Sequence, residues 1–294
     1  MMFIEPPEIA PLHPTEVAED DLLRSRVVAA ILNTSAGRLP QRIARTSAPT
    51  LVQFWDTPVI PDDVQACMDT WHAIEANGIE RVLFDDARAR QYIARHYGPP
   101  YSVAFDRCPH PAMRCDYFRL CYMAREGGIY VDADDVYVGG DPETLLPDEV
   151  LRVQALCYDH DTDSMVPSQR FVGRDHRATW TYYVNNNPLI APAGHPILSL
   201  ALARATRALM AQTEDRPDIQ SKTGPGNLTA CLVQHAIALG RLGKPLDFVV
   251  LTDWDSFAVS RWPLGYRSDD RNWRLWRRDQ LEGIDGLTTG RPRA

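Results

Sequence analysis

The sequence predicts an open α/β sheet with crossover connections. Between residues 50 and 140, short apolar segments alternate with longer segments of helical periodicity, which is the pattern of strands joined by helices. Acidic residues follow two of the apolar segments, at Asp85-Asp86 and at Asp132-Ala133-Asp134. Open α/β proteins bind ligands at the carboxyl edge of the sheet. We therefore expect one sheet, with helices on both faces and helical additions, and a ligand site at that edge.

The chain before residue 50 predicts a helical addition. Thr15 can cap a helix over residues 16–32, in which apolar side chains recur on one stripe. A connector follows, and the C-terminal residues are rich in Gly, Arg and Thr. The expected divisions are an N-terminal helical extension (1–49), one main domain (50–282) and a flexible tail (283–294).

The elements of the main domain follow from apolar periodicity and from helix start and stop signals. Pro61 suits the first turn of a helix, and Asp62 and Asp63 favour its positive end. Gly98 closes one later helix, and Gly127-Gly128 closes another. Strands are expected at 51–55, 82–84, 129–131, 136–138, 150–157, 179–184 and 248–251, and helices at 61–78, 87–97, 111–126, 195–212 and 226–239.

Composition restricts the class of protein and its partners. Hydrophobic residues at 45% and charged residues at 24% are ordinary for a soluble globular protein. A formal charge of −8 without a basic cluster argues against a nucleic-acid partner. No apolar run approaches the ~20 residues of a membrane helix, although peripheral membrane association stays open. The six cysteines form no Cys-x-x-Cys pair, and together with the absence of a signal peptide they favour a cytoplasmic protein.

The acidic segment after Gly127-Gly128 is the strongest chemical signal. Asp132 and Asp134 end an apolar strand, and two carboxylates one residue apart on a bend can share one hard divalent cation. Such a cation can bind a diphosphate. A solvated acidic turn is the alternative, but the flanking segments are apolar. Burial of acids there costs free energy unless something cationic meets them.

Asp116 and Arg119 lie three residues apart on the preceding helix and so share a face. By itself this pair indicates a surface ion pair worth a few tenths of a kcal/mol. An apolar stripe adjoins the pair, however, and the acidic bend follows within a few residues. Together these features favour a functional role.

The pattern Asp116-x-x-Arg119 followed by Gly127-Gly128-Ile129-Tyr130-Val131-Asp132-Ala133-Asp134 resembles the core motif of the DXD-containing sugar-nucleotide glycosyltransferases of family 32. The large clostridial glucosylating toxins are distant relatives of that family. The segment from Leu51 to Trp55 is similar to the opening strand of the family, Ile-His-Gln-x-Trp. The likeness covers roughly Thr50 to Gly140.

The resemblance implies a GT-A-like (Rossmann-like) open mixed sheet and a retaining hexosyltransferase. The donor would be a UDP- or GDP-sugar, and the acceptor a saccharide, as in polysaccharide biosynthesis, or a protein. Asp132 would contact the ribose or the donor sugar, and Asp134 would bind Mn²⁺ or Mg²⁺. Asp116 and Arg119 would contact sugar hydroxyls and a phosphate oxygen, and Trp55 would stack near the base.

The resemblance also points to further substrate contacts, at Gln53, Gly128, Tyr130, Asn185, Asn186 and Gly224. The amides of Asn185-Asn186-Asn187 are expected at the end of a strand, although a turn explains them equally well. Gly224 would begin a helix whose free N–H groups could face phosphate or sugar.

The chain departs from the family at its third metal ligand. Val52 replaces the His of the opening strand, and no histidine follows His235 to complete the metal shell. Ser260, in a Ser-x-Trp segment, and Asp255 are the remaining candidates for metal ligands.

Two other functions stay open on sequence. The segment Ile129–Asp134 also resembles the nucleophile strand of haloacid-dehalogenase-type phosphatases, in which the first aspartate attacks phosphorus. That family has Gly-Thr directly afterwards, whereas this chain has Asp135-Val136. The second alternative is a catalytically inactive sugar-nucleotide-binding module, since the missing histidine could mean that turnover has been lost.

Overall fold

The computed structural model describes residues 14–35, 49–140, 149–174, 176–213 and 218–275. The predicted tail, 283–294, lies outside these residues. The first elements in chain order are α1 (Pro14–Ser35), β1 (Thr50–Phe54), α2 (Asp62–Asp69), the 3-10 helix η1 (Thr70–Asn77), β2 (Glu80–Phe84), α3 (Asp86–His96), α4 (Pro99–Asp106), α5 (Pro111–Glu126), β3 (Gly128–Tyr130) and β4 (Asp135–Tyr137).

The second half of the chain adds long strands and further helices. Its elements are β5 (Leu151–Asp159), β6 (Ser164–Met165), α6 (Ser168–Phe171), β7 (Trp180–Ala191), α7 (Pro196–Met210), α8 (Ile219–Lys222), α9 (Pro225–Arg241), β8 (Phe248–Leu251), η3 (Trp254–Ser256), β9 (Ala258–Ser260) and η4 (Gly265–Ser268). Among the described residues, no helix is both long and apolar enough to cross a membrane.

The strands form one open mixed sheet, as predicted. Its order is β2-β1-β3-β7-β5-β6, with β8 also paired to β5. The strands β1, β2 and β3 run parallel, so their carboxyl ends share one edge. The strand β7 runs antiparallel to both β3 and β5. The strand β4 leaves this sheet and pairs with β9 in a separate two-stranded ribbon.

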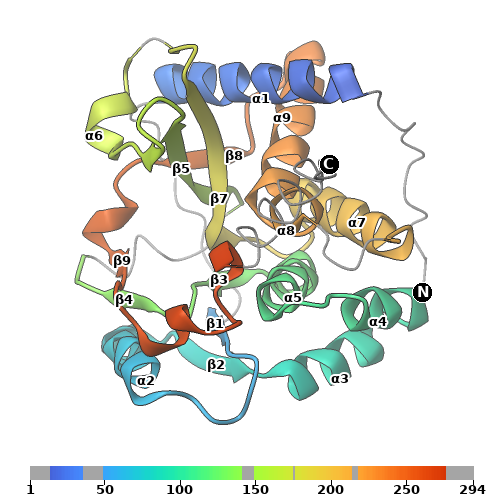
Figure 1. Ribbon diagram of the computed structural model, residues 1–294, viewed down its shortest axis with the longest axis vertical. Coiled ribbons are helices and arrows are strands. Elements are labelled where there is room, and N and C mark those ends of the chain that lie inside the picture. The colour runs from blue at the N-terminus through green and yellow to red at the C-terminus, as the bar shows by residue number, and fades with distance from the viewer. Residues whose placement is uncertain (1–13, 36–48, 141–148, 175, 214–217, 276–294) are drawn as a thin grey trace, which may run out of the picture.

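Helices cover both faces of the sheet (Figure 1). The larger core lies on the face covered by α1, α5, α7 and α9, and alternate strand residues such as Val52 and Tyr130 point into it. A smaller core lies on the opposite face, where Leu51 and Ile129 meet Trp71 of η1 and Trp254 of η3. Because neighbouring strand residues face opposite sides, both faces of β1 and β3 are buried, which explains why these strands are largely apolar.

The helix expected over residues 87–97 ends before Gly98 as predicted, since α3 stops at His96. The sequence analysis did not expect the helix that follows, α4, in which Pro99 occupies the first turn, a position that tolerates proline because the missing N–H has no partner there. A different expectation was wrong. Asn185, Asn186 and Asn187 were expected at a strand end, but they lie inside β7. Their amides bond to neighbouring side chains and backbone rather than forming a turn.

Candidate functional site

The acidic bend lies where β3 ends, at the carboxyl edge shared by β1 and β2. The side-chain amide of Gln53, on β1, donates to the carbonyl oxygen of Asp132 at 3.4 Å. The side chain of Asn187, on β7, accepts a hydrogen bond from the backbone N–H of Asp132 at 3.1 Å. The two strands that flank β3 therefore fix the backbone of the bend.

The Arg119 guanidinium is buried beneath the bend. It donates to the Asn186 carbonyl at 2.8 Å and to Asp132 Oδ1 at 2.9 Å, and it stacks over the Tyr130 ring at 4.3 Å. The Tyr130 hydroxyl donates to the same Asp132 oxygen at 3.1 Å. One oxygen of Asp132 is thus fixed from below, while its side chain stays 31% exposed toward solvent.

Asp116 completes this buried network. Its Oδ1 lies 3.2 Å from the Arg119 guanidinium and accepts from the Asn186 amide at 2.8 Å. Its Oδ2 accepts from the Thr223 hydroxyl at 3.3 Å. Burial raises the pKa of Asp116 to about 6, although the positive charge of Arg119 acts in the opposite direction. The Asp-x-x-Arg pair is therefore a buried ion pair that joins α5 to β7 and the bend.

Asp134 contacts the C-terminal part of the chain. Its carboxylate forms an ion pair with Arg267 and accepts from the Tyr266 hydroxyl at 2.7 Å. Burial raises the pKa of Asp134, and the nearby charge of Asp132 raises it further. The pKa of Asp135 is raised for the same reasons, burial first and then Asp134. Among the described residues, two arginines thus form ion pairs with this group of three carboxylates: Arg119 with Asp132 and Arg267 with Asp134.

The donor set fits a divalent cation that is also held by a bound diphosphate. Within the described residues, no three His, Cys, Asp or Glu side chains gather to complete a metal site. Mg²⁺ is typically bound by one or two carboxylates together with water and substrate phosphates, and Asp132 and Asp134 supply those two. Positive charge there would favour the ionised carboxylates and so oppose the burial and the mutual repulsion that raise the pKa values of Asp134 and Asp135.

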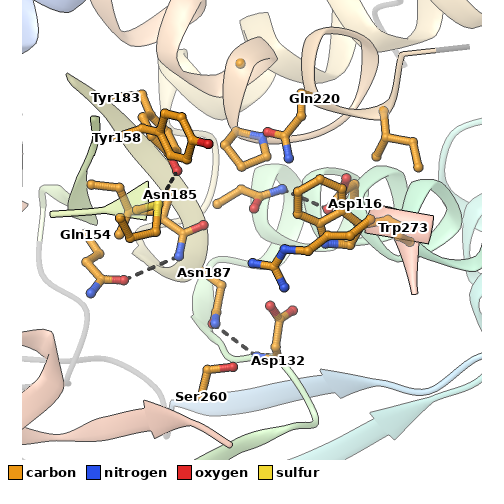
Figure 2. A pocket seen from close by; sticks show the side chains of 18 of the residues that line it. Asp116, Asp132, Gln154, Tyr158, Tyr183, Asn185, Asn187, Gln220, Ser260 and Trp273 are labelled. Carbon is orange, nitrogen blue, oxygen red and sulfur yellow. Dashed lines mark hydrogen bonds between the residues drawn. The ribbon is translucent and has the colours of Figure 1, made fainter. Parts of the chain in front are cut away.

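The two uncertain metal ligands occupy different positions. Ser260 is opposite Asp135 in the β4–β9 pair and is exposed beside the bend, as Figure 2 shows. Asp255 lies on η3 and bonds to the Gln154 amide at 3.3 Å, so the structure places it with β5. Of the two, Ser260 is the better placed to reach a cation at the bend.

The bend opens into a cavity of about 1530 Å³ (Figure 2). Asp116, Arg119, Asp132, Asp134 and Trp55 line it, as do Asn185 and Asn186. The Trp55 ring contacts the edge of Tyr266 at 5.2 Å, and the Arg271 guanidinium lies over it at 5.4 Å. The cavity therefore brings together an acidic bend, an aromatic side chain and several arginines.

Four of the predicted binding residues lie behind the cavity wall. Gln53 and Tyr130 are buried and bond to Asp132. A Cβ on Gly128 would lie 2.6 Å from the Thr50 carbonyl oxygen, and a Cβ on Gly224 would lie 3.3 Å from Asp116 Oδ2. Gln53 and Tyr130 therefore support Asp132, Gly224 lies against Asp116, and Gly128 allows β3 to approach β1 closely. Their role as substrate contacts stays a prediction.

Sequence reasoning missed several residues of the site. Asn187 and Thr223 bond to the acidic side chains or their backbone, and Arg267, Arg271 and Arg274 line the cavity from the C-terminal segment. Residues 266 and 267 meet a carboxylate more than 130 positions earlier, and no local spacing marks them. The one available signal was the high density of arginine after residue 260 in an acidic chain.

Comparison with known sequence families relates the acidic bend to a sugar-binding motif. Residues 61–150 match the family described as "Glycosyltransferase sugar-binding region containing DXD motif". This stretch of the chain is similar to the DXD-type sugar-binding region of glycosyltransferases. In this region, Asp132-Ala133-Asp134 is the DXD motif, and α5 and β3 position it. The match covers less than a third of the chain and supports sugar transfer from a nucleotide-sugar donor.

Other comparisons are more distant. A solved structure, PaToxG glycosyltransferase, is similar to 90% of this chain and 97% of its own, with 15% sequence identity and a TM-score of 0.42. No curated protein sequence matches the chain significantly.

Proposed function

We propose that the protein is a metal-dependent, retaining hexosyltransferase that uses a nucleoside-diphosphate sugar and either Mn²⁺ or Mg²⁺. The observation that carries this proposal is the DXD bend itself. Its two carboxylates line a cavity together with Trp55 and several arginines, so acidic cation ligands and basic phosphate ligands face one space. The diphosphate of a nucleotide sugar is negatively charged. Arginines can contact it directly, and the carboxylates can contact it through a divalent cation.

In this reaction the bond between the anomeric carbon and the diphosphate oxygen breaks, and its electron pair stays on the diphosphate. A new bond joins the anomeric carbon to an acceptor oxygen, whose proton passes to an oxygen of the departing diphosphate. The divalent cation would neutralise charge on the departing diphosphate. Asp132 and Asp134 would hold that cation, and Arg267 and Arg271 would contact the diphosphate.

The buried pair would position the transferred sugar. Asp116 borders the cavity, and its oxygens are fixed by Asn186 and Thr223. Arg119 holds Asp132 from below and so keeps its second oxygen directed into the cavity. Trp55 would lie near the base. We further propose that residues 50–282 form the transferase domain, that residues 1–49 are an extension, and that the protein acts in the cytoplasm.

The geometry supports a transferase better than a haloacid-dehalogenase-like phosphatase. In that chemistry the second aspartate acts as acid and base. That family has Gly-Thr directly after the second aspartate, whereas this chain has Asp135-Val136. Residues 61–150 instead match the DXD-containing sugar-binding region, and the buried Asp116–Arg119 pair adjoins the bend.

A thermal-shift screen across UDP- and GDP-sugars, with and without Mn²⁺, tests the proposal. A ligand that binds the folded state raises the melting temperature, so one donor should raise it only when Mn²⁺ is present. Hydrolysis of that donor should then release nucleoside diphosphate. Binding without hydrolysis or transfer would indicate the inactive module, and phosphate release from a generic ester would indicate the phosphatase.

A further inference from the structure

The cavity is larger than a single small ligand needs. Its volume is about 1530 Å³, whereas ligand pockets usually measure ~300–1,000 Å³. The DXD bend and the arginines occupy one side of it. The remaining space adjoins the antiparallel pair β5 and β7, and Figure 2 shows Gln154, Tyr158, Tyr183 and Asn185 on that side.

These side chains come from one face of the sheet. Successive strand residues alternate between faces, so Tyr183 and Asn185 face the cavity while Val184 between them is buried in the core. On β5, Gln154 and Tyr158 face the cavity in the same way. We define the β5–β7 wall as the cavity-facing residues of this pair, namely Gln154, Leu156, Tyr158, Thr181, Tyr183 and Asn185.

The β5–β7 wall begins next to the DXD bend. Asn187 bonds to the Asp132 backbone and Asn186 bonds to Asp116, and the wall continues along the same strand. The distance from Asn185 to Thr181 is ~13 Å at the usual rise of a strand. A ligand along the wall therefore ends beside the proposed transfer site and extends away from it by more than one sugar ring.

The chemistry of the wall is neutral. The side-chain NH₂ group of Asn185 donates to Gln154 Oε1 at 3.3 Å. This bond does not use the side-chain oxygen of Asn185, which can therefore accept from a ligand in the cavity. The Gln220 amide, on α8, borders the same space from above (Figure 2). The two amides lie at the end of the wall nearest the DXD bend, and the two tyrosines lie farther along it. Charged side chains line the same cavity beside the wall: Asp255 accepts from Gln154, Asp163 accepts from Tyr158, and Arg274 lies near Tyr183.

We propose that the β5–β7 wall binds the acceptor, and that the acceptor is a neutral oligosaccharide. Sugar rings present apolar C–H faces that pack on aromatic side chains and hydroxyls that bond to amides. Tyr183 would stack against a sugar ring, and Asn185 and Gln220 would bond to its hydroxyls. This inference names the acceptor class of the proposed transferase and rests on that proposed function.

Isothermal titration of the full chain with neutral tetrasaccharides tests this assignment. The probes are maltotetraose, cellotetraose and α-1,6-mannotetraose, with tetragalacturonate as the anionic counterpart, in the presence of UDP and Mn²⁺. At least one neutral probe should bind more tightly than ~10 mM, and Tyr183→Ala should weaken it by about tenfold or more. Tyr101→Ala removes a half-buried tyrosine outside the cavity and should leave the affinity unchanged.

Any of four results would overturn the proposal. In the titrations, these are that no neutral probe binds, that Tyr183→Ala binds as well as wild type, or that tetragalacturonate binds as tightly as the neutral probes. The fourth is transfer to a protein acceptor that is unaffected by Tyr183→Ala. A melting curve for each variant shows whether it is folded. UDP binding to the wild type, titrated beforehand, tests the proposed function separately, because it does not depend on the acceptor.

Discussion

Removal of the Arg119 guanidinium should strongly destabilise the protein. The side chains of Arg119 and Asp116 are 5% and 9% exposed, and Arg119 also bonds to Asp132 and to the Asn186 carbonyl. In Arg119→Met, Asp116 would be a buried carboxylate without its cation. Breaking a buried pair in this way costs about 3–5 kcal/mol.

Urea and thermal denaturation measure this effect. A chain of 294 residues has an unfolding entropy of about 0.6 kcal/mol/K, so the melting temperature should fall by ~5–8 °C. The double variant Arg119→Met/Asp116→Asn should recover part of the loss, since it no longer buries that charge. Arg90→Met, which breaks an exposed pair with Asp106, is the control and should leave the melting temperature nearly unchanged. If Arg119→Met behaved like Arg90→Met, the buried pair would not stabilise the fold.

Two further predictions concern the elements that support the site. His110 caps α5 as a neutral imidazole, because Nδ1 accepts from the Ala112 N–H at 3.0 Å and Nε2 donates to the Asp270 carbonyl at 2.9 Å, and burial lowers its pKa. As the pH is lowered through about 6.5, the imidazole of His110 becomes protonated in the unfolded chain before it does in the folded protein, and this destabilises the folded state. The difference in the free energy of unfolding between wild type and His110→Asn should therefore decrease when the pH is lowered from about 7.5 to about 5.5. An equal difference at both pH values would refute this. Gly128→Ala should destabilise the protein more than Gly98→Ala. Both glycines have a positive φ, so alanine is strained at either position. Only at Gly128 would the new Cβ also collide with another atom, the Thr50 carbonyl oxygen at 2.6 Å. We expect about 1–2 kcal/mol at Gly98 and a further ~1–3 kcal/mol at Gly128, and equal melting temperatures would contradict the close approach of β3 to β1.

Local sequence signals predicted the part of the site that is local in the chain. The helix α5, the strand β3 and the acidic bend are contiguous, so helix caps, apolar periodicity and the spacing of Asp116 and Arg119 were sufficient to place them. The same signals showed that Asp132 and Asp134 follow a buried strand. Whether the Asp-x-x-Arg pair was exposed or buried depended on Asn186 of β7, which lies 67 residues after Arg119 and 70 after Asp116.

The partners of these residues could not be predicted because they come from distant segments. Asn185-Asn186-Asn187-Pro188 has the composition of a turn, yet it continues β7 in the middle of the sheet. The pairing of β7 with β5 shifts register between Val153 and Ala155, opposite this segment, which accommodates a proline in a central strand. Tyr266 and Arg267 reach Asp134 only through the tertiary fold, and no periodicity in the sequence indicates that contact.

The central claim is that the DXD bend binds a divalent cation together with a nucleotide diphosphate, and calorimetric titration of UDP or GDP tests it most directly. For wild type, Mn²⁺ should lower the Kd of the nucleotide by about tenfold or more. In Asp134→Asn the ratio of the Kd values without and with Mn²⁺ should approach one, while Asp69→Asn, an exposed carboxylate outside the cavity, should behave as wild type. A nucleotide affinity that is independent of Mn²⁺ in wild type, or an unchanged ratio in Asp134→Asn, would contradict the account.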